Sequence, residues 1–212
     1  VRSAAKNHAD VIIVTAPEQY APVLHALLES NGKPSGVGME MRKELSISAF
    51  QSTAAYDSAT SNELCSRFSE NRIPNRIHAS TGEGRELRYG ENPHQPASFF
   101  PDSGTPTGLS AAVQHGGKPL SYNNYLDLDA ALRLARSLTQ TCDFASHSCV
   151  VIKHTNPCGA AVAESQVSAW ENALASDPES AFGCVIAFDR VVGKETAEAI
   201  GKHFFECIIA PG

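Results

Sequence analysis

The chain has 212 residues, enough for one large domain or two small ones, and 42% of them are hydrophobic, as in a globular protein with a substantial core. Charged residues make up 19%, which argues against disorder. The net charge of −6 argues against nucleic acid as the main partner, because phosphate backbones bind basic faces. A small phosphorylated ligand is compatible with this charge, since a few cations suffice to bind it.

The apolar runs are short, such as residues 11–14, and fall far below the roughly 20 residues that a membrane-spanning helix needs. The N-terminal residues lack the apolar segment of a signal peptide and there is no initiator Met, so we expect the chain to begin inside a longer protein. The cysteines show no metal-knuckle spacing, and those in or beside apolar segments are expected to be buried thiols of a reducing compartment. The chain has six cysteines, Cys65, Cys142, Cys149, Cys158, Cys184 and Cys207, and the last four of these lie in or beside apolar segments.

The N-terminal third predicts one β–α unit followed by a long helix. The β-branched run 10–16 predicts a buried strand, and the apolar spacing over 18–30 predicts a helix. A second helix is expected over 39–67, where no Pro or Gly interrupts the chain. The polar stretch 69–86 is expected to be a domain linker.

The remainder predicts an α/β domain with a mixed or parallel sheet, because helical and strand patterns alternate. It opens with a fixed loop at 87–95 and turns at 101–109. The expected elements are helix 126–138, strand 149–152, helix 164–175, strand 184–188, helix 194–204 and strand 207–210.

The strongest candidate site is Lys153-His154, at the carboxyl end of an apolar strand, where open α/β sheets bind ligands. A neutral imidazole accepts a proton near pH 7, and an ammonium stabilises an oxyanion. From residue types alone, a surface lysine and a histidine that caps the strand end are the somewhat commoner explanation, since such pairs are frequent.

Weaker candidates lie in four other segments. Arg88 is suited to bidentate binding of a phosphate or carboxylate, and Tyr89 adds a ring and a hydroxyl, although the same loop also suits a mere domain entry. The run 121–124 before a helix is more typical of an N-cap than of a ligand site. Gly183 would let a ligand approach the backbone, or is a turn glycine. Lys6 could be catalytic, but a lone lysine near the start of the chain is usually a solvated charge.

A zinc site is rejected. Asn156-Pro157-Cys158 is similar to the Pro-Cys of zinc deaminases, but these need a second Cys three residues later and a His-x-Glu elsewhere. Position 161 is Ala and the chain has no His-x-Glu. The glycine-rich signatures of dinucleotide and phosphate loops are absent as well.

Several segments occur in one fixed order: VRSAAKNHADVIIV, AFQSTAAYDS, LRYGENPHQ, GKPLSYNN, VIKHTNPCGAAVAES, DPESAFGCVIAFDR and ECIIAPG. Together they resemble the bifunctional AICAR transformylase/IMP cyclohydrolase family. The resemblance implies an α/β fold class: the C-terminal part of a methylglyoxal-synthase-like cyclohydrolase domain over 1–70, a linker over 71–86, and the first part of a cytidine-deaminase-like transformylase domain over 87–212.

The resemblance also implies the chemistry. The amine of AICAR takes the formyl group of 10-formyltetrahydrofolate to give FAICAR, which closes to IMP with loss of water. His154 matches the general base, Lys153 the residue that stabilises the transition state, and Lys6 the acid/base lysine of the cyclohydrolase. The matches to substrate-binding residues are Arg88, Tyr89, Asn123, Gly183 and Glu206.

The family implies a cytosolic homodimer that binds AICAR, FAICAR and IMP, with no metal in this part, no nucleic acid and no membrane. The upstream phosphate-binding segments and the downstream folate-binding parts of the family are absent from these residues. The chain alone is therefore expected to complete neither site. The alternative is a truncated, non-catalytic remnant that serves only as a binding or assembly module.

Overall fold

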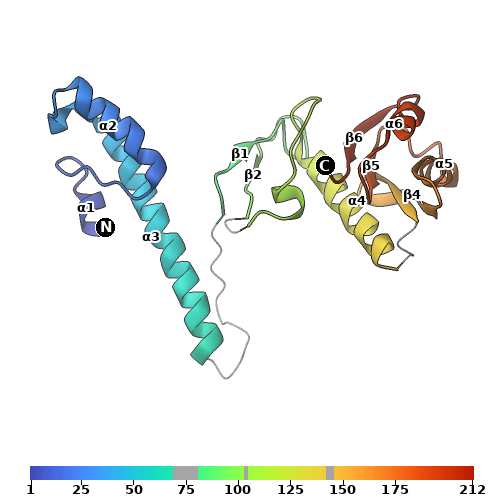
Figure 1. Cartoon of the computed structure of the whole chain (residues 1–212), viewed down its shortest axis with the longest axis horizontal. Coiled ribbons are helices and arrows are strands. Elements are labelled where there is room, and N and C mark those ends of the chain that lie inside the picture. The colour runs from blue at the N-terminus through green and yellow to red at the C-terminus, as the bar shows by residue number, and fades with distance from the viewer. Residues whose placement is uncertain (69–80, 103–104, 142–145) are drawn as a thin grey trace. The chain divides into compact units, whose positions relative to one another are not determined.

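The computed structural model divides the chain into two units, residues 1–80 and 81–212, which are described separately below (Figure 1). Residues 71–80 of the predicted linker 71–86 lie outside the described residues. Its last two residues, Arg85 and Glu86, pair with Phe99 and Ser98 in the second unit. The structure describes residues 1–68, 81–102, 105–141 and 146–212.

The first unit is helical in its described part. The helices expected over 18–30 and 39–67 are confirmed, the first of them beginning with a 3-10 turn at Pro17. The elements are α1 (Arg2–Lys6), η1 (Pro17–Gln19), α2 (Tyr20–Glu29), η2 (Pro34–Gly36) and α3 (Met39–Phe68).

The strand predicted over 10–16 is wrong, since residues 1–68 contain no β-strand. A strand needs a neighbour to pair with, and this part of the chain supplies none. The apolar side chains of residues 12–14 pack instead against Val23 of α2, Leu45 of α3 and Val37. Burial therefore explains the hydrophobic pattern here without any backbone ladder.

The second unit is a four-stranded sheet with helices on both faces and a small two-stranded ribbon. The predicted strands and helices of this region are all present; the helix expected over 126–138 is longer and the one over 194–204 shorter. The elements are β1 (Arg85–Glu86), β2 (Ser98–Phe99), η3 (Gly108–Ser110), α4 (Tyr122–Thr141), β3 (His147–Lys153), β4 (Asn156–Ala163), α5 (Gln166–Ser176), β5 (Cys184–Phe188), α6 (Lys194–Ile200) and β6 (Phe205–Ile209).

The sheet is mixed, one of the two forms that the sequence left open. Its strand order is β4-β3-β5-β6; β3 is antiparallel to β4 and to β5, and β5 is parallel to β6. The carboxyl end of β3 therefore lies beside the amino ends of the other three strands. We call this edge the Lys153 end of the sheet.

The hairpin partner β4 was not predicted. It begins Asn156-Pro157 and contains Gly159, residues that are typical of turns. Pro157 is tolerated because β4 is an edge strand in the part of the sheet that the structure describes. Gly159 is required by packing, since a Cβ at this position would lie 1.9 Å from the carbonyl oxygen of Ala173 in α5.

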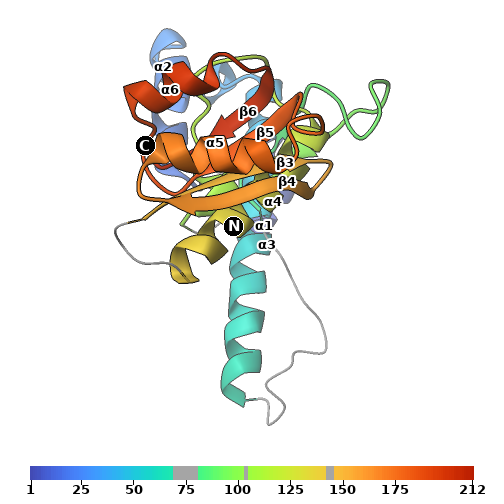
Figure 2. The same cartoon turned by 90° about the vertical axis from the view of Figure 1, so that its right-hand side faces the viewer.

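The core is divided between the two faces of the sheet because side chains of a strand alternate. On one face Cys149 and Val151 pack with α5 and α6, around the buried Trp170. On the other, Val150 and Ile152 pack against α4. Figure 2 shows α5 on one side of β3 and β4, with α4 on the other. No helix in the described ranges is both long and apolar enough to cross a membrane.

Candidate functional site

Lys153 and His154 lie at the tip of the β3–β4 hairpin. Lys153 pairs with Asn156, so His154 and Thr155 form a two-residue turn, and both have positive φ, +53° and +63°. This is the pattern of a type I′ turn, which normally uses Asn or Gly. The left-handed conformation costs roughly 1–2 kcal/mol per residue for side chains other than Gly. A β-branched Thr there marks a strained position of the kind that concentrates at functional sites.

Hydrogen bonds hold this turn. The carbonyl oxygen of His154 accepts from Thr155 Oγ1 at 2.6 Å and from Asn156 Nδ2 at 2.8 Å. The Thr155 N–H donates to Asp127 Oδ1 of α4 at 2.7 Å. The histidine itself is exposed and its ring is available to a ligand.

Lys153 is tied to the segment before β5. Its ammonium donates to the carbonyl oxygen of Phe182 at 2.8 Å. The next residue, Gly183, has φ +73° and donates its N–H to Phe204 at 3.0 Å, just before β6. Gly183 is thus a turn glycine by its backbone, and it also lies immediately beside the lysine.

The loop between β1 and β2 presents Arg88 and Tyr89. Backbone bonds join it to the start of α4: the Arg88 N–H donates to Leu120, and the Tyr122 N–H to Tyr89. The guanidinium lies 4.8 Å from the centre of the Tyr89 ring and donates to its hydroxyl at 3.1 Å. These backbone bonds fix the positions from which both side chains project, and Arg88 remains exposed.

The N-cap predicted within 121–124 is confirmed for Ser121. Its hydroxyl accepts the Asn124 N–H at 3.2 Å, and Asn124 Oδ1 accepts the Ser121 N–H at 3.0 Å, which is a reciprocal capping arrangement. Asn123 takes no part in the cap. It lies exposed in the first turn of α4 and donates to the Glu91 carbonyl at 3.0 Å, across to the Arg88 loop.

Glu206 is placed at an irregularity in β6. Cys184 pairs with Phe205 and Val185 with Cys207, so Glu206 is the extra residue of a bulge, and it is exposed. Bulges of this kind redirect a side chain at a sheet end. Burial raises the pKa of Cys207 to about 11, the Glu206 carboxylate adds to the rise, and the Arg88 guanidinium opposes it. Arg88 therefore acts within electrostatic reach of β6.

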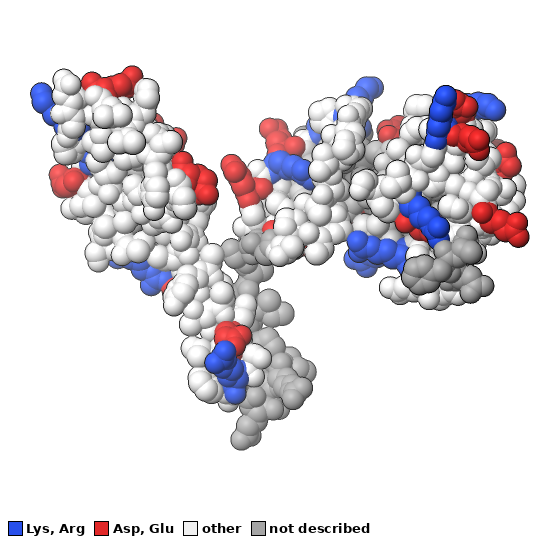
Figure 3. Space-filling view, in the orientation of Figure 1, with Lys and Arg blue, Asp and Glu red and all other residues white. Residues whose placement is uncertain are grey.

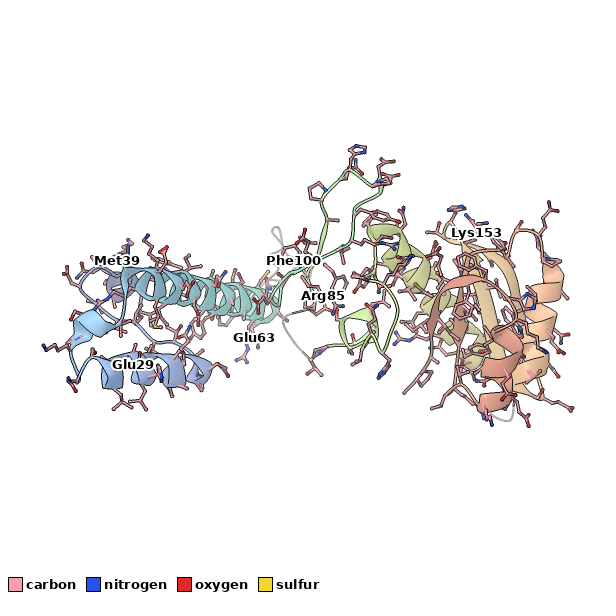
Figure 4. The ribbon with its side chains drawn as sticks, turned by 90° about the horizontal axis from the view of Figure 1, so that it is seen from above. Glu29, Met39, Glu63, Arg85, Phe100 and Lys153 are labelled. Carbon is pink, nitrogen blue, oxygen red and sulfur yellow. The ribbon has the colours of Figure 1, made fainter. Side chains whose placement is uncertain are left out.

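The candidate residues for formyl transfer consequently come from five segments of the chain to one end of the sheet. Lys153, labelled in Figure 4, is the last residue of β3 and marks this end of the sheet. Acidic and basic side chains are interspersed over the face drawn in Figure 3, so positive charge for anion binding is local rather than a stripe. The residues gathered are Arg88, Tyr89, Asn123, Lys153, His154, Gly183 and Glu206.

Lys6 is not among them. It is the last residue of α1 in the first unit, and it is exposed. The Ser46 hydroxyl of α3 donates to the Ala5 carbonyl at 2.7 Å, which fixes the end of α1.

The cysteines are partly as expected. Cys149 and Cys184 are buried, whereas Cys65, Cys158 and Cys207 are half-buried. Cys142 lies outside the described residues. Within the described ranges no group of three His, Cys, Asp or Glu side chains is placed to hold a metal ion.

Two contributors to the site were missed by the sequence reasoning. Asp127 lies inside a predicted helix and carries no motif, and the Phe182 carbonyl acts through its backbone. The only signal for Asp127 was its place on α4, the helix whose first turn contains Asn123. A hydrogen bond between residues 28 positions apart has no sequence pattern of its own.

Comparison with known proteins gives the family. The family model described as "AICARFT/IMPCHase bienzyme" matches residues 4–212. Three similar proteins are each named "Bifunctional purine biosynthesis protein PurH": from Rhodopirellula baltica, 45% identical over 100% of this chain; from Desulfitobacterium hafniense, 41% over 99%; and from Rippkaea orientalis, 40% over 100%. The chain spans 39–40% of their lengths. Because the match runs through both units and includes every segment of the site, the chain belongs to the AICARFT/IMPCHase bienzyme family.

Proposed function

We propose that this chain forms part of a bifunctional enzyme of purine biosynthesis, which transfers the formyl group of 10-formyltetrahydrofolate to AICAR and closes FAICAR to IMP with loss of water. The proposal joins two kinds of support. The family supplies the reaction class. The gathering of Lys153, His154 and Arg88 at one end of the sheet supplies an acid/base group, an oxyanion-stabilising cation and an anion-binding cation.

The position of His154 at the hairpin tip is the observation that best supports the proposal. An exposed imidazole at a strained hairpin tip, with its backbone held on both sides, is a positioned general base. In formyl transfer the AICAR amine attacks the formyl carbon, a C–N bond forms, and the amine loses a proton to His154. The carbon–nitrogen bond to tetrahydrofolate then breaks, and the same proton passes to the departing nitrogen.

Lys153 supports the charged intermediate. The formyl oxygen becomes an oxyanion when the amine adds, and an ammonium beside it stabilises that charge. The hydrogen bond to the Phe182 carbonyl uses only one of the three donors of the lysine, so the others are free to face substrate. Arg88 offers bidentate bonds to the AICAR phosphate, with Tyr89, Asn123, Gly183 and Glu206 as further substrate contacts.

Ring closure is assigned to the first unit. We propose that residues 1–70 belong to the cyclohydrolase domain and residues 87–212 to the transformylase domain, with Lys6 as the acid/base lysine of ring closure. The complete enzyme would be a cytosolic homodimer that binds AICAR, FAICAR and IMP and needs no metal. A non-catalytic remnant is the competing function, favoured only by the 39–40% of the relatives' length that the chain spans.

The deciding experiment uses the complete protein of which this chain is part. It is incubated with AICAR and 10-formyltetrahydrofolate, and FAICAR and IMP are separated by chromatography. We expect IMP to form from both substrates and also from FAICAR alone. A folded complete protein that makes neither FAICAR nor IMP would establish the non-catalytic alternative.

A further inference from the structure

We propose that Asp127 is a positioning residue for His154 in formyl transfer; this inference rests on the proposed function. Asp127 lies in the second turn of α4, half-buried, and its carboxylate accepts a hydrogen bond from the backbone N–H of Thr155 in the hairpin, at 2.7 Å. It acts on His154 through the peptide group that follows the histidine.

That peptide group is held at both of its polar atoms. The carbonyl of His154 and the N–H of Thr155 belong to the same planar unit. The carbonyl accepts from Thr155 Oγ1 at 2.6 Å and from Asn156 Nδ2 at 2.8 Å, both within the hairpin. The N–H of Thr155 donates to the carboxylate of Asp127, which lies outside the hairpin on α4. The orientation of this plane sets ψ of His154 and φ of Thr155, and so it holds the backbone from which the imidazole projects.

The hairpin would not hold this conformation by local preference. His154 and Thr155 both occupy the left-handed region, at φ +53° and +63°, which disfavours them and especially the β-branched threonine. A charge-assisted bond to a carboxylate is about twice as strong as a neutral one, so the bond to Asp127 is a strong restraint on this turn. Without it the turn is free to relax toward a conformation that redirects the ring.

The hydrogen bond from Thr155 to Asp127 is a rigid restraint because α4, which carries Asp127, is packed firmly on the sheet. Leu128, the neighbour of Asp127, is buried in the cluster that α4 forms with Ile152 of β3 and Val185 of β5. Burial is the main cause of the raised pKa values of Cys158 and Cys207, and the Asp127 carboxylate adds a smaller rise to both, so its charge is felt on β4 and β6. One side chain thus couples the helix that carries Asn123 to the turn that carries His154.

The test measures formyl transfer in the complete protein with Asp127→Ala, Asp127→Asn and the control Asp129→Ala. Asp129 lies on the same helix, and its carboxylate bonds to Arg133 at 2.9 Å instead of the hairpin. We expect Asp127→Ala to lower kcat at least about tenfold while KM for AICAR changes less than about twofold. Asp127→Asn keeps an acceptor oxygen and should retain kcat within about threefold, and Asp129→Ala should match the parent.

A double substitution separates positioning from general damage. If Asp127 acts through His154, then Asp127→Ala should cause little further loss in a His154→Ala background. An equal loss in both backgrounds, or a normal kcat in Asp127→Ala beside an active parent, would overturn this inference alone. A parent protein without formyl transfer would overturn the proposed function and this inference with it.

Discussion

The Lys153 ammonium and the Phe182 carbonyl are joined by a hydrogen bond of 2.8 Å. This bond connects the end of β3 to the residue before Gly183, and so to the start of β5. The acceptor is a neutral carbonyl and not a carboxylate, so this bond holds the ammonium at the hairpin tip without neutralising it. An oxyanion that forms beside His154 would meet this charge.

His154→Ala in the complete protein should lower formyl transfer about 10²–10⁴-fold, the usual cost of losing a positioned general base. Conversion of FAICAR to IMP should persist, because that site is assigned to the first unit. The two steps are measured separately by product chromatography. His115→Ala, an exposed histidine in a loop of the same unit, is the matched control and should stay active. Near-normal transfer in His154→Ala would remove the role assigned to this residue.

Lys6→Ala should show the opposite pattern. Loss of the acid/base lysine should slow ring closure and spare formyl transfer, so FAICAR should accumulate when both substrates are supplied. Lys43→Ala, which removes an exposed lysine of α3 paired with Glu40, serves as the control. A parallel fall of both activities in Lys6→Ala would show that the lysine is structural.

Gly159→Ala should destabilise the second unit by about 1–3 kcal/mol, the usual cost of overpacking. The added Cβ would lie 1.9 Å from the Ala173 carbonyl oxygen, a backbone atom that cannot move aside cheaply. Gly116→Ala is the control, since a Cβ there has no neighbour within 4 Å. Urea unfolding followed by circular dichroism measures both variants. Equal stability of the two would contradict the close packing of β4 on α5.

The stability of the second unit should fall as the pH rises from about 8.5 toward 11. Burial raises the pKa of Cys184 to about 11, and an unfolded thiol titrates near about 8.5. Between these values the unfolded chain has released a proton that the folded chain keeps, so rising pH favours unfolding. Cys184→Ala should flatten this slope in urea titrations at several pH values. Val185→Ala, equally buried and not titratable, should lower stability without changing the slope.

The elements of the second unit were predictable because its apolar runs and helical spacing are strong. The strand over 10–16 was not, since its β-branched residues satisfy burial against helices, and the pattern cannot reveal that a pairing partner is absent. The β3–β4 hairpin was hidden by Pro157 and Gly159. Its turn uses His154 and Thr155 rather than the usual Asn-Gly, because the local preference is overridden by the bonds around one peptide group.

The sequence allowed individual site residues to be named, but it did not predict how they are arranged in space. Lys153 at a strand end could be located from the sequence. Its position beside the amino ends of β5 and β6 could not, because the mixed strand order decides it. Glu206 is exposed because it is the extra residue of a bulge in β6, and no residue type in the sequence predicts that change of register. The role of Asp127 could not be predicted from the sequence, since its contact is to a backbone atom.

The last prediction concerns the outer face of α2. Tyr20, Leu24 and Leu28 recur every fourth residue, on one side of the helix, and are 62%, 57% and 68% exposed. The opposite side is already used: Val23 and Leu27 pack inward. A helix with a second apolar stripe exposes surface that tends to associate with other surfaces of the same kind.

Residues 1–212 produced alone should therefore self-associate in a concentration-dependent way, and show neither formyl transfer nor ring closure. Leu24→Gln together with Leu28→Gln should reduce the light scattering, because the change removes apolar area without entering the core. His25→Gln, an exposed polar position beside the stripe, should leave the scattering unchanged. A monodisperse and active 212-residue protein would show that the chain suffices as an enzyme, and it would assign the α2 stripe no part in association.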